Sequence, residues 1–263
     1  MPERTAARRG LGWAWVPLVV CGAFLYIPIA VLVAMSFNDG GSAYSWDGFS
    51  FRWYGELAAD ERILSSLRTS LLIAVGATAI ATVLGTLLAV GLARHNRSRL
   101  LEASAMAPAI FPDLLLAIGL LSFYYVAEIP KSATTVLLGH AAFGTAFVVA
   151  VVRARLSGMD LSAEEASRDL GAGALSTFLR ITIPSIAPAI VAGALLVFTL
   201  SLDEFVIAFF TAGPTTQTLP ITVYSMVRVG VTPVINALAT VLVVVSIAVV
   251  VIAARTVRRS DEA

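Results

Sequence analysis

The stretch Glu164-Glu165-Ala166-Ser167-Arg168-Asp169-Leu170-Gly171, followed by Ile181-Thr182-Ile183-Pro184, separates two long apolar segments of this sequence. Its charged residues and glycines distinguish it from those neighbours, which are almost entirely apolar. We interpret residues 153–185 as a polar loop that joins two membrane-embedded segments. On composition alone, a plain solvated loop is favoured over a surface that binds a partner.

The composition of the whole chain is typical of a protein that crosses a membrane several times. Hydrophobic residues make up 58% of the 263 positions and charged residues only 13%, whereas soluble domains carry about 25% charged residues. The mean hydropathy is +0.88. A net charge of +1 indicates no general attraction to nucleic acid. One cysteine and two histidines are too few for a Cys/His metal cluster.

Six segments are long and apolar enough to span a bilayer, which takes about 20 residues as a helix. Helices are expected because the hydrocarbon core offers no hydrogen-bond partner to an open backbone. The sequence therefore predicts an all-α membrane protein with spans at about 13–36, 66–92, 103–126, 132–152, 186–210 and 233–254. The apolar run after the N-terminal arginines is longer than the 7–15 residues of a signal-peptide core, so we expect a retained first span.

The arginines predict the orientation of these spans. Counted for six spans, they fall on one side of the membrane: Arg4, Arg8, Arg9, Arg94, Arg97, Arg99, Arg153, Arg155, Arg168, Arg180, Arg255, Arg258 and Arg259. The positive-inside rule makes that side cytoplasmic. Both termini and the loop at 153–185 are therefore predicted to be cytoplasmic. The segment at 37–65 would lie outside, and its many aromatic residues favour a membrane–water boundary.

Small residues recur every four positions in the second predicted span, at Ala77, Ala81, Gly85 and Ala89. Such a stripe lets another helix approach closely. Packing within the chain and packing against a second subunit are both compatible with it.

Three acidic residues lie within predicted spans, namely Asp113, Asp203 and Glu204. Acids in a span are costly and usually face a cavity or a partner. Pro108 and Pro112 precede Asp113 and favour a kinked helix. With Tyr124 and Tyr125, the acids could form a cation site that combines carboxylates and aromatic faces. Helix capping by Asp113, and a water boundary at Asp203 and Glu204, are the structural alternatives. For His140, a helix–helix hydrogen bond is favoured over a proton relay.

The polar loop has its own local signals. Ser162 and Glu165 fit a capping box at the start of a short helix that would end near Leu170. Gly171 and Gly173 favour a tight turn, and a second short helix would run from about Leu175 to Ile181 and end before Pro184. Because Ala166, Ala172 and both glycines are small, the loop would allow a partner to approach closely.

The spacing within the loop resembles the EAA signature of permease subunits of ABC importers. Glu165-Ala166-Ser167 is followed after three residues by Gly171, and after nine more by Ile181-x-Ile183-Pro184. Ser167 and Ile183 replace the Ala and Leu of that pattern. The resemblance implies the type I ABC importer permease fold, in which this loop docks on the ATPase subunit. It implies a coupling role for Glu164, Glu165, Ala166, Ser167, Arg168, Asp169, Gly171, Ala172, Gly173, Ile181 and Pro184.

Further segments are similar to the second permease subunit of spermidine/putrescine importers. They are Pro108 to Asp113, Phe198 to Phe205, and Leu219 to Pro233 with Asn236 to Thr240. The resemblance implies a multi-pass protein of the bacterial inner membrane. It implies three kinds of partner: a similar second permease, a cytoplasmic ATPase dimer and an extracytoplasmic polyamine-binding protein. Where that branch carries two acids together, this chain has Asp203 and Glu204.

The sequence itself argues that ATP is used elsewhere. A P-loop needs the pattern G-x-x-x-x-G-K-[ST], and the only lysine, Lys131, follows Pro130. We therefore expect no cofactor on this chain, with ATP and Mg²⁺ in the partner ATPase, and no enzymatic activity of its own. An ABC permease for ferric ion, thiamine or an anion, and a secondary carrier, are the alternatives; no Ser/His/Asp set or H-E-x-x-H motif supports a membrane enzyme.

Overall fold

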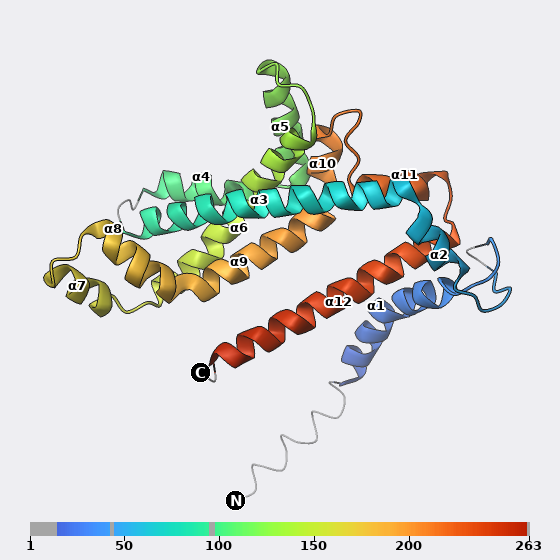
Figure 1. The fold of residues 1–263 in the computed structure, drawn as a ribbon, viewed down its shortest axis with the longest axis horizontal. Coiled ribbons are helices and arrows are strands. Elements are labelled where there is room, and N and C mark those ends of the chain that lie inside the picture. Colours follow the sequence, from blue (N-terminus) through green and yellow to red (C-terminus); the bar gives the residue numbers. More distant parts are fainter. Residues whose placement is uncertain (1–14, 43–44, 95–97, 262–263) are drawn as a thin grey trace, which may run out of the picture. The chain divides into compact units, whose positions relative to one another are not determined.

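The computed structural model describes residues 15–42, 45–94 and 98–261, with side chains up to residue 248. The regular structure of the described residues is helical, apart from one isolated β-bridge between Asn38 and Phe49. The chain divides into two compact units. Unit 1 comprises Met1–Glu61 and Val223–Ala263, and unit 2 comprises Arg62–Thr222. Figure 1 shows the helices in chain order.

Unit 1 is built from three helices, α1 (Trp15–Met35), α2 (Arg52–Ala59) and α12 (Pro233–Asp261), and α1 and α2 both contact α12. No side chain of α1 is buried. A helix that is apolar all round and this exposed is suited to lipid or to a partner helix.

The segment between α1 and α2 is held by Asn38 and by aromatic packing. The Asn38 side chain donates to the Ser45 carbonyl at 2.7 Å and accepts from the Asp47 amide at 2.7 Å. The Trp53 indole donates to the Asn38 carbonyl at 2.7 Å. Ring contacts join Phe37, Phe49, Phe51 and Tyr54. The aromatic residues expected at a membrane boundary therefore also contact one another in a small cluster, in which Phe49 and Phe51 stay exposed.

Unit 2 is organised around α6 (Ala133–Ser157), which is the most buried of the long apolar helices. Besides α3 (Glu61–Arg94), it contacts α4 (Arg99–Ile110), α5 (Asp113–Val126), α9 (Ile183–Asp203) and α10 (Val206–Thr211). The long helix α3 lies almost entirely in this unit, and α11 (Leu219–Val229) passes from unit 2 into unit 1.

The small-residue stripe of α3 packs within the chain. Ala77, Ala81 and Ala89 are fully buried. A Cβ on Gly85 would lie 2.6 Å from the Cβ of Val148 on α6, so α3 approaches α6 as closely as a glycine permits. The same holds on the other side of α6, where a Cβ on Gly144 would lie 2.5 Å from Cγ1 of Val197 on α9. The stripe could pack within the chain or against a second subunit, and in the structure it packs against α6 of the same chain.

The segment predicted as the third span does not form one helix. Helix α4 ends at Ile110, α5 begins at Asp113, and their axes differ by 107°. Pro112 explains the break, because a residue before proline favours an extended backbone and proline has no amide to donate. Phe111 accordingly has φ −72° and ψ 145°.

The fifth predicted span is also interrupted. Helix α9 ends at Asp203, Glu204 is extended with φ −71° and ψ 104°, and α10 begins at Val206. By length and composition, four helices of the described residues could each cross a membrane, or five if the bent α4–α5 pair counts as one span. Helix α12 covers the predicted sixth span, although the apolar part whose side chains are described, Pro233–Ala248, is shorter. Arg4, Arg8, Arg9 and Arg97, used to predict orientation, lie outside the described residues.

Candidate functional site

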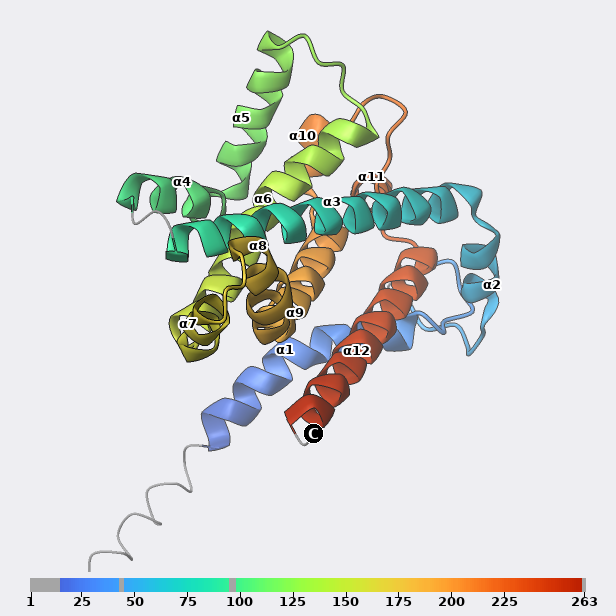
Figure 2. The ribbon, with the colours of Figure 1, turned by 60° about the vertical axis from the view of Figure 1, so that its left-hand side comes forward.

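The polar loop folds into α7 (Ser162–Asp169) and α8 (Ala174–Thr177). Figures 1 and 2 show both helices at the end of unit 2 where α3 ends and α9 begins. The predicted capping box is wrong, because Ser162 is the first helical residue and Leu161 the N-cap. Asp160 performs the capping instead, accepting hydrogen bonds from the Ser162 amide at 3.0 Å and hydroxyl at 2.8 Å. These bonds lower the pKa of the Asp160 carboxyl.

One face of the loop is open. Glu165, Ala166, Arg168, Asp169 and Gly171 are exposed, whereas Ser167 is half-buried and shares a 3.0 Å hydrogen bond with Thr177 of α8. Two large apolar residues of the loop also stand out, since Leu170 is 89% exposed and Leu175 70% exposed. Exposed leucines on a short polar loop favour a surface that a partner protein covers.

Gly171 makes the turn between α7 and α8. Its φ of +81° lies in the left-handed region that favours glycine. A Cβ at this position would meet nothing within 4 Å, so the requirement for glycine inside the chain is one of backbone conformation alone. Ala172 and Gly173 complete the connection, with Gly173 at the N-cap of α8.

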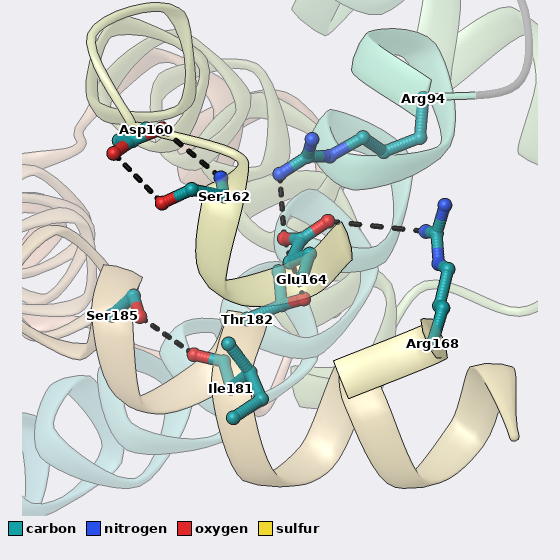
Figure 3. A network of polar contacts seen from close by, with 8 residues as sticks. All are labelled: Arg94, Asp160, Ser162, Glu164, Arg168, Ile181, Thr182 and Ser185. Atoms are coloured by element: carbon teal, nitrogen blue, oxygen red, sulfur yellow. Dashed lines mark hydrogen bonds and ion pairs between the residues drawn. The ribbon is translucent and has the colours of Figure 1, made fainter. Parts of the chain in front are cut away.

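Glu164 differs from the other predicted coupling residues because its side chain points into the protein, where it is 5% exposed (Figure 3). Its Oε1 accepts from Nη2 of Arg94, the last residue of α3, at 2.7 Å. The same oxygen accepts from the Thr182 hydroxyl at 2.8 Å. Arg168 lies farther away, with Nη2 at 3.9 Å from Oε2.

The sequence predicts that the second helix of the loop ends before Pro184, and this prediction is wrong. Helix α8 continues through a π-helical turn, η1 (Phe178–Thr182), directly into α9. Pro184 has no amide for a bond to the carbonyl four residues earlier. In the wider π turn the Ile183 amide bonds to the carbonyl of Phe178, five residues back, which lets the helix pass the proline. Ile181 is part of this turn and Pro184 follows it.

The three acids predicted for a substrate path lie near one another in unit 2. Asp113 is the first residue of α5, Asp203 the last of α9, and Glu204 occupies the break before α10. Asp113 and Asp203 both lie close enough to Glu204 to interact with it electrostatically. Both aspartates are exposed, whereas Glu204 is buried and its Oε1 accepts from the Ile207 amide at 2.9 Å. The acids are therefore gathered where two helices are interrupted.

The two tyrosines predicted for the same path have different surroundings. Tyr124 is buried and its hydroxyl donates to the Thr135 carbonyl at 3.0 Å, a contact that joins α5 to α6. Tyr125 is 84% exposed. Their part in a substrate path stays a prediction. His140 of α6 is buried, with Nδ1 2.8 Å from the hydroxyl of Ser201 on α9, as expected for a helix–helix hydrogen bond.

No sequence pattern indicated that Arg94 and Thr182 would bond to Glu164. They lie 70 and 18 positions from Glu164, so no helical or strand spacing connects them to it. In the part of the chain that the structure describes, no group of three or more His, Cys, Asp or Glu residues could hold a metal ion.

Comparisons with known proteins agree with this architecture. Residues 81–261 match the family described as "Binding-protein-dependent transport system inner membrane component". The chain is 44% identical to the putrescine transport system permease protein PotI of Escherichia coli K12 over 237 residues, covering 87% of this chain and 84% of PotI. It is 39% identical over 239 residues to the spermidine/putrescine transport system permease protein PotC of the same organism, covering 90% of each.

Among solved structures, a chain of a bacterial ABC transporter that imports the acidic polysaccharide alginate has a TM-score of 0.73 and 19% identity, covering 98% of both chains. That likeness is one of fold. With the family match over most of the length and the close identity to two transport permeases, this chain belongs to the family of binding-protein-dependent transport system inner-membrane components.

Proposed function

We propose that this chain is one permease subunit of an ATP-driven importer of polyamines such as putrescine and spermidine. The observation that carries the proposal is the group of Asp113, Asp203 and Glu204 at two helix breaks, in a chain whose relatives are named as putrescine and spermidine/putrescine permeases. Polyamines carry several ammonium groups on a flexible methylene chain, so clustered carboxylates suit them.

The physical chemistry of the bilayer supports a path at these breaks. Non-helical backbone at membrane depth is tolerated only where it is buried in protein or lines a water-filled cavity. Acids at such positions typically mark substrate or ion pathways. The two exposed aspartates can reach a passing ammonium group, while Glu204 holds the start of α10 through its bond to the Ile207 amide. Moderate binding suits import, since the substrate must also leave.

Energy would enter through the cytoplasmic loop. The chain lacks a P-loop lysine, and the exposed face of α7 and α8, with Leu170 and Leu175, offers a surface for a cytoplasmic ATPase dimer that binds ATP and Mg²⁺. A similar second permease would complete the path as a heterodimer, and an extracytoplasmic binding protein would deliver the polyamine. The exposed apolar face of α1 provides area for lipid or the second permease.

In the membrane, we infer six spans with both termini in the cytoplasm of a bacterial inner membrane. Under this topology the bent α4–α5 pair counts as one span and α12 as the sixth. Helices α7 and α8 then face the cytoplasm, and the break between α9 and α10 lies toward the outer side.

Uptake of labelled putrescine by cells that express the whole importer tests the proposal. Asp203→Asn combined with Asp113→Asn should lower uptake at limiting substrate on the order of tenfold, since the loss of about 1.4 kcal/mol of interaction changes affinity tenfold. Glu128→Gln is the matched control, because it removes an exposed carboxylate of unit 2 outside the acid group. Glu204 is left unchanged because its loss would also free the amide of Ile207.

Unchanged uptake kinetics in the double variant, at equal amounts of protein in the membrane, would remove the acids from the path. Competition separates the alternative cargoes. Excess spermidine should suppress putrescine uptake, whereas suppression by ferric ion, thiamine or sulfate alone would identify an ABC permease for another solute. Uptake that persists without ATP but stops with a proton uncoupler would identify a secondary carrier instead.

A further inference from the structure

Glu164 is the residue of the polar loop that a docking surface does not explain. Its neighbour Glu165 is exposed, whereas Glu164 is buried, and Glu164 and Glu204 are the only acidic residues among the buried side chains of the described residues. A buried carboxylate is costly unless it is paired and hydrogen-bonded. The position of Glu164 is therefore maintained by specific partners inside the protein.

These partners come from two different membrane helices. Arg94 ends α3, and Thr182 ends the π turn from which α9 continues (Figure 3). Both bond to the same carboxylate oxygen, at 2.7 and 2.8 Å. We call Glu164, Arg94 and Thr182 the Glu164 anchor. Glu164 lies in the first turn of α7, so the anchor joins the first turn of this helix to α3 and to the start of α9.

Arg94 in turn depends on Glu164 as its counter-ion. Only 16% of the Arg94 side chain is exposed, and its buried Nε has no hydrogen-bond partner in the described structure. If α7 moved away from the end of α3, a largely buried guanidinium would lose its counter-ion. Because separation leaves both charges uncompensated, the pair resists it strongly. When α7 moves, we therefore expect α3 and α9 to move with it, since the alternative is separation of Glu164 from Arg94.

Helix α9 connects the anchor to the acid group. It begins immediately after Thr182 and ends at Asp203, so a helix of 21 residues, about 30 Å long, joins the two places. A hydrogen-bonded helix transmits displacement along its axis, whereas a flexible loop would not. The hydrogen bond between Ser167 and Thr177 joins α7 to α8, which continues through η1 into α9, so it gives α7 a second link to α9.

We propose that Glu164 is a positioning residue that couples the docking loop to α3 and α9, and does not itself contact the ATPase. The inference rests on the proposed docking of an ATPase on the exposed face of the loop. It separates two roles within that loop, with Glu165 and the exposed leucines facing the partner and the Glu164 anchor carrying the movement into the membrane helices. Loss of the anchor uncouples ATP hydrolysis from transport.

The experiment measures putrescine imported per ATP hydrolysed by the complete importer in proteoliposomes. Glu164→Gln and Arg94→Gln should both keep the ATPase subunits bound and hydrolysing ATP, while the ratio of import to hydrolysis falls at least fivefold. The exchanged pair Glu164→Arg with Arg94→Glu should recover at least half of the ratio. Thr182→Val, which removes one hydrogen bond to the Glu164 carboxylate and keeps the shape of the side chain, should lower the ratio at least twofold, because bonds to charged groups are among the stronger ones.

Glu102→Gln is the matched control, because it breaks another arginine–glutamate pair near this end, between Glu102 of α4 and Arg153 of α6 at 2.6 Å, without touching α7 or α8. Its import-to-hydrolysis ratio should equal that of the wild type. A ratio that is also unchanged in Glu164→Gln and Thr182→Val would overturn the proposal. So would loss of the ATPase subunits from Glu164→Gln in step with import, which would make Glu164 a docking residue. Failure of the wild-type complex to import putrescine would instead refute the proposed function.

Discussion

Adjacent residues of α7 have opposite surroundings because successive side chains on an α-helix point about 100° apart. Glu164 meets Arg94 and Thr182, and Glu165 meets solvent. Removing one partner of a buried ion pair costs about 3–5 kcal/mol, while exposed pairs contribute about 0–1 kcal/mol. Of the two ion pairs of Glu164, the contact with Arg94 is therefore the one that matters for stability, and the 3.9 Å contact with the exposed Arg168 is minor.

Gly171 allows the proposed docking surface to be tested by a single substitution. Gly171→Asp should leave the protein in the membrane, because the turn between α7 and α8 has room for a side chain and Asp tolerates a positive φ better than most residues. The added side chain and charge should block close approach of the ATPase. We expect at least a tenfold loss of copurified ATPase subunits and of polyamine uptake, equivalent to about 1.4 kcal/mol of binding.

Gly158→Asp is the control for this substitution. Gly158 is an exposed glycine between α6 and α7, has an ordinary negative φ, and also has space for a side chain. Copurification of the ATPase should be normal in this variant. Equal recovery of the ATPase with Gly171→Asp would contradict the assignment of the α7–α8 face as the docking surface.

At the scale of elements, unit 2 combines close helix packing with two broken helices. Helix α6 is flanked by α3 and α9 at distances that glycines set, whereas α5 and α10 begin at breaks beside the acid group. Lipid chains give little hydrophobic driving force between helices, so close packing of small residues supplies much of the cohesion. The close packing of α3, α6 and α9 can thus stabilise the unit despite the helix breaks before α5 and α10.

Gly144→Val tests this packing directly. The new side chain would overlap Val197 of α9 and approach Ala81 of α3, so either the helices move apart or other side chains shift. Overpacking of this kind costs about 1–3 kcal/mol. We expect a lower midpoint of thermal unfolding in detergent, measured on the purified complex.

Gly119→Val is the comparison for Gly144→Val, because Gly119 lies in α5 of the same unit with nothing within 4 Å of its missing Cβ. Its unfolding midpoint should stay near that of the wild type. An equal midpoint for Gly144→Val would mean that α6 and α9 are separated in the assembled protein.

At the scale of the whole molecule, the proposed topology places the loop after α6 inside and the loop after α10 outside the cell. Single cysteines at Ser157 and Thr215, both exposed positions, distinguish the two sides once Cys21 is replaced by serine. In intact spheroplasts, a membrane-impermeant maleimide should label Thr215→Cys and leave Ser157→Cys unlabelled. Permeabilised spheroplasts should show labelling of both, and the reverse pattern in intact spheroplasts would invert the orientation.

Local chemistry alone predicted the helical fold class, the position of the polar loop and the turn at Gly171. Each of these depends on neighbouring residues, through apolar run length, charge density or backbone freedom. Local signals were weaker at helix ends. Asp160 rather than Ser162 caps the helix, because its carboxylate lies within hydrogen-bond reach of the Ser162 amide. The helix continues past Pro184 because a π turn precedes the proline.

Only the tertiary structure decided which of these residues meet. Asp203 and Glu204 are adjacent in the sequence, but Asp113, 90 positions before Asp203, comes close to Glu204 only because α4–α5 and α9–α10 both break where they do. Glu164 was assigned to the loop's coupling residues by its sequence position, but its burial and its bond to Arg94 depend on how α3 and α7 pack. Sequence fixes φ, ψ and periodicity along short segments, whereas contacts between distant segments arise from packing that no local pattern encodes.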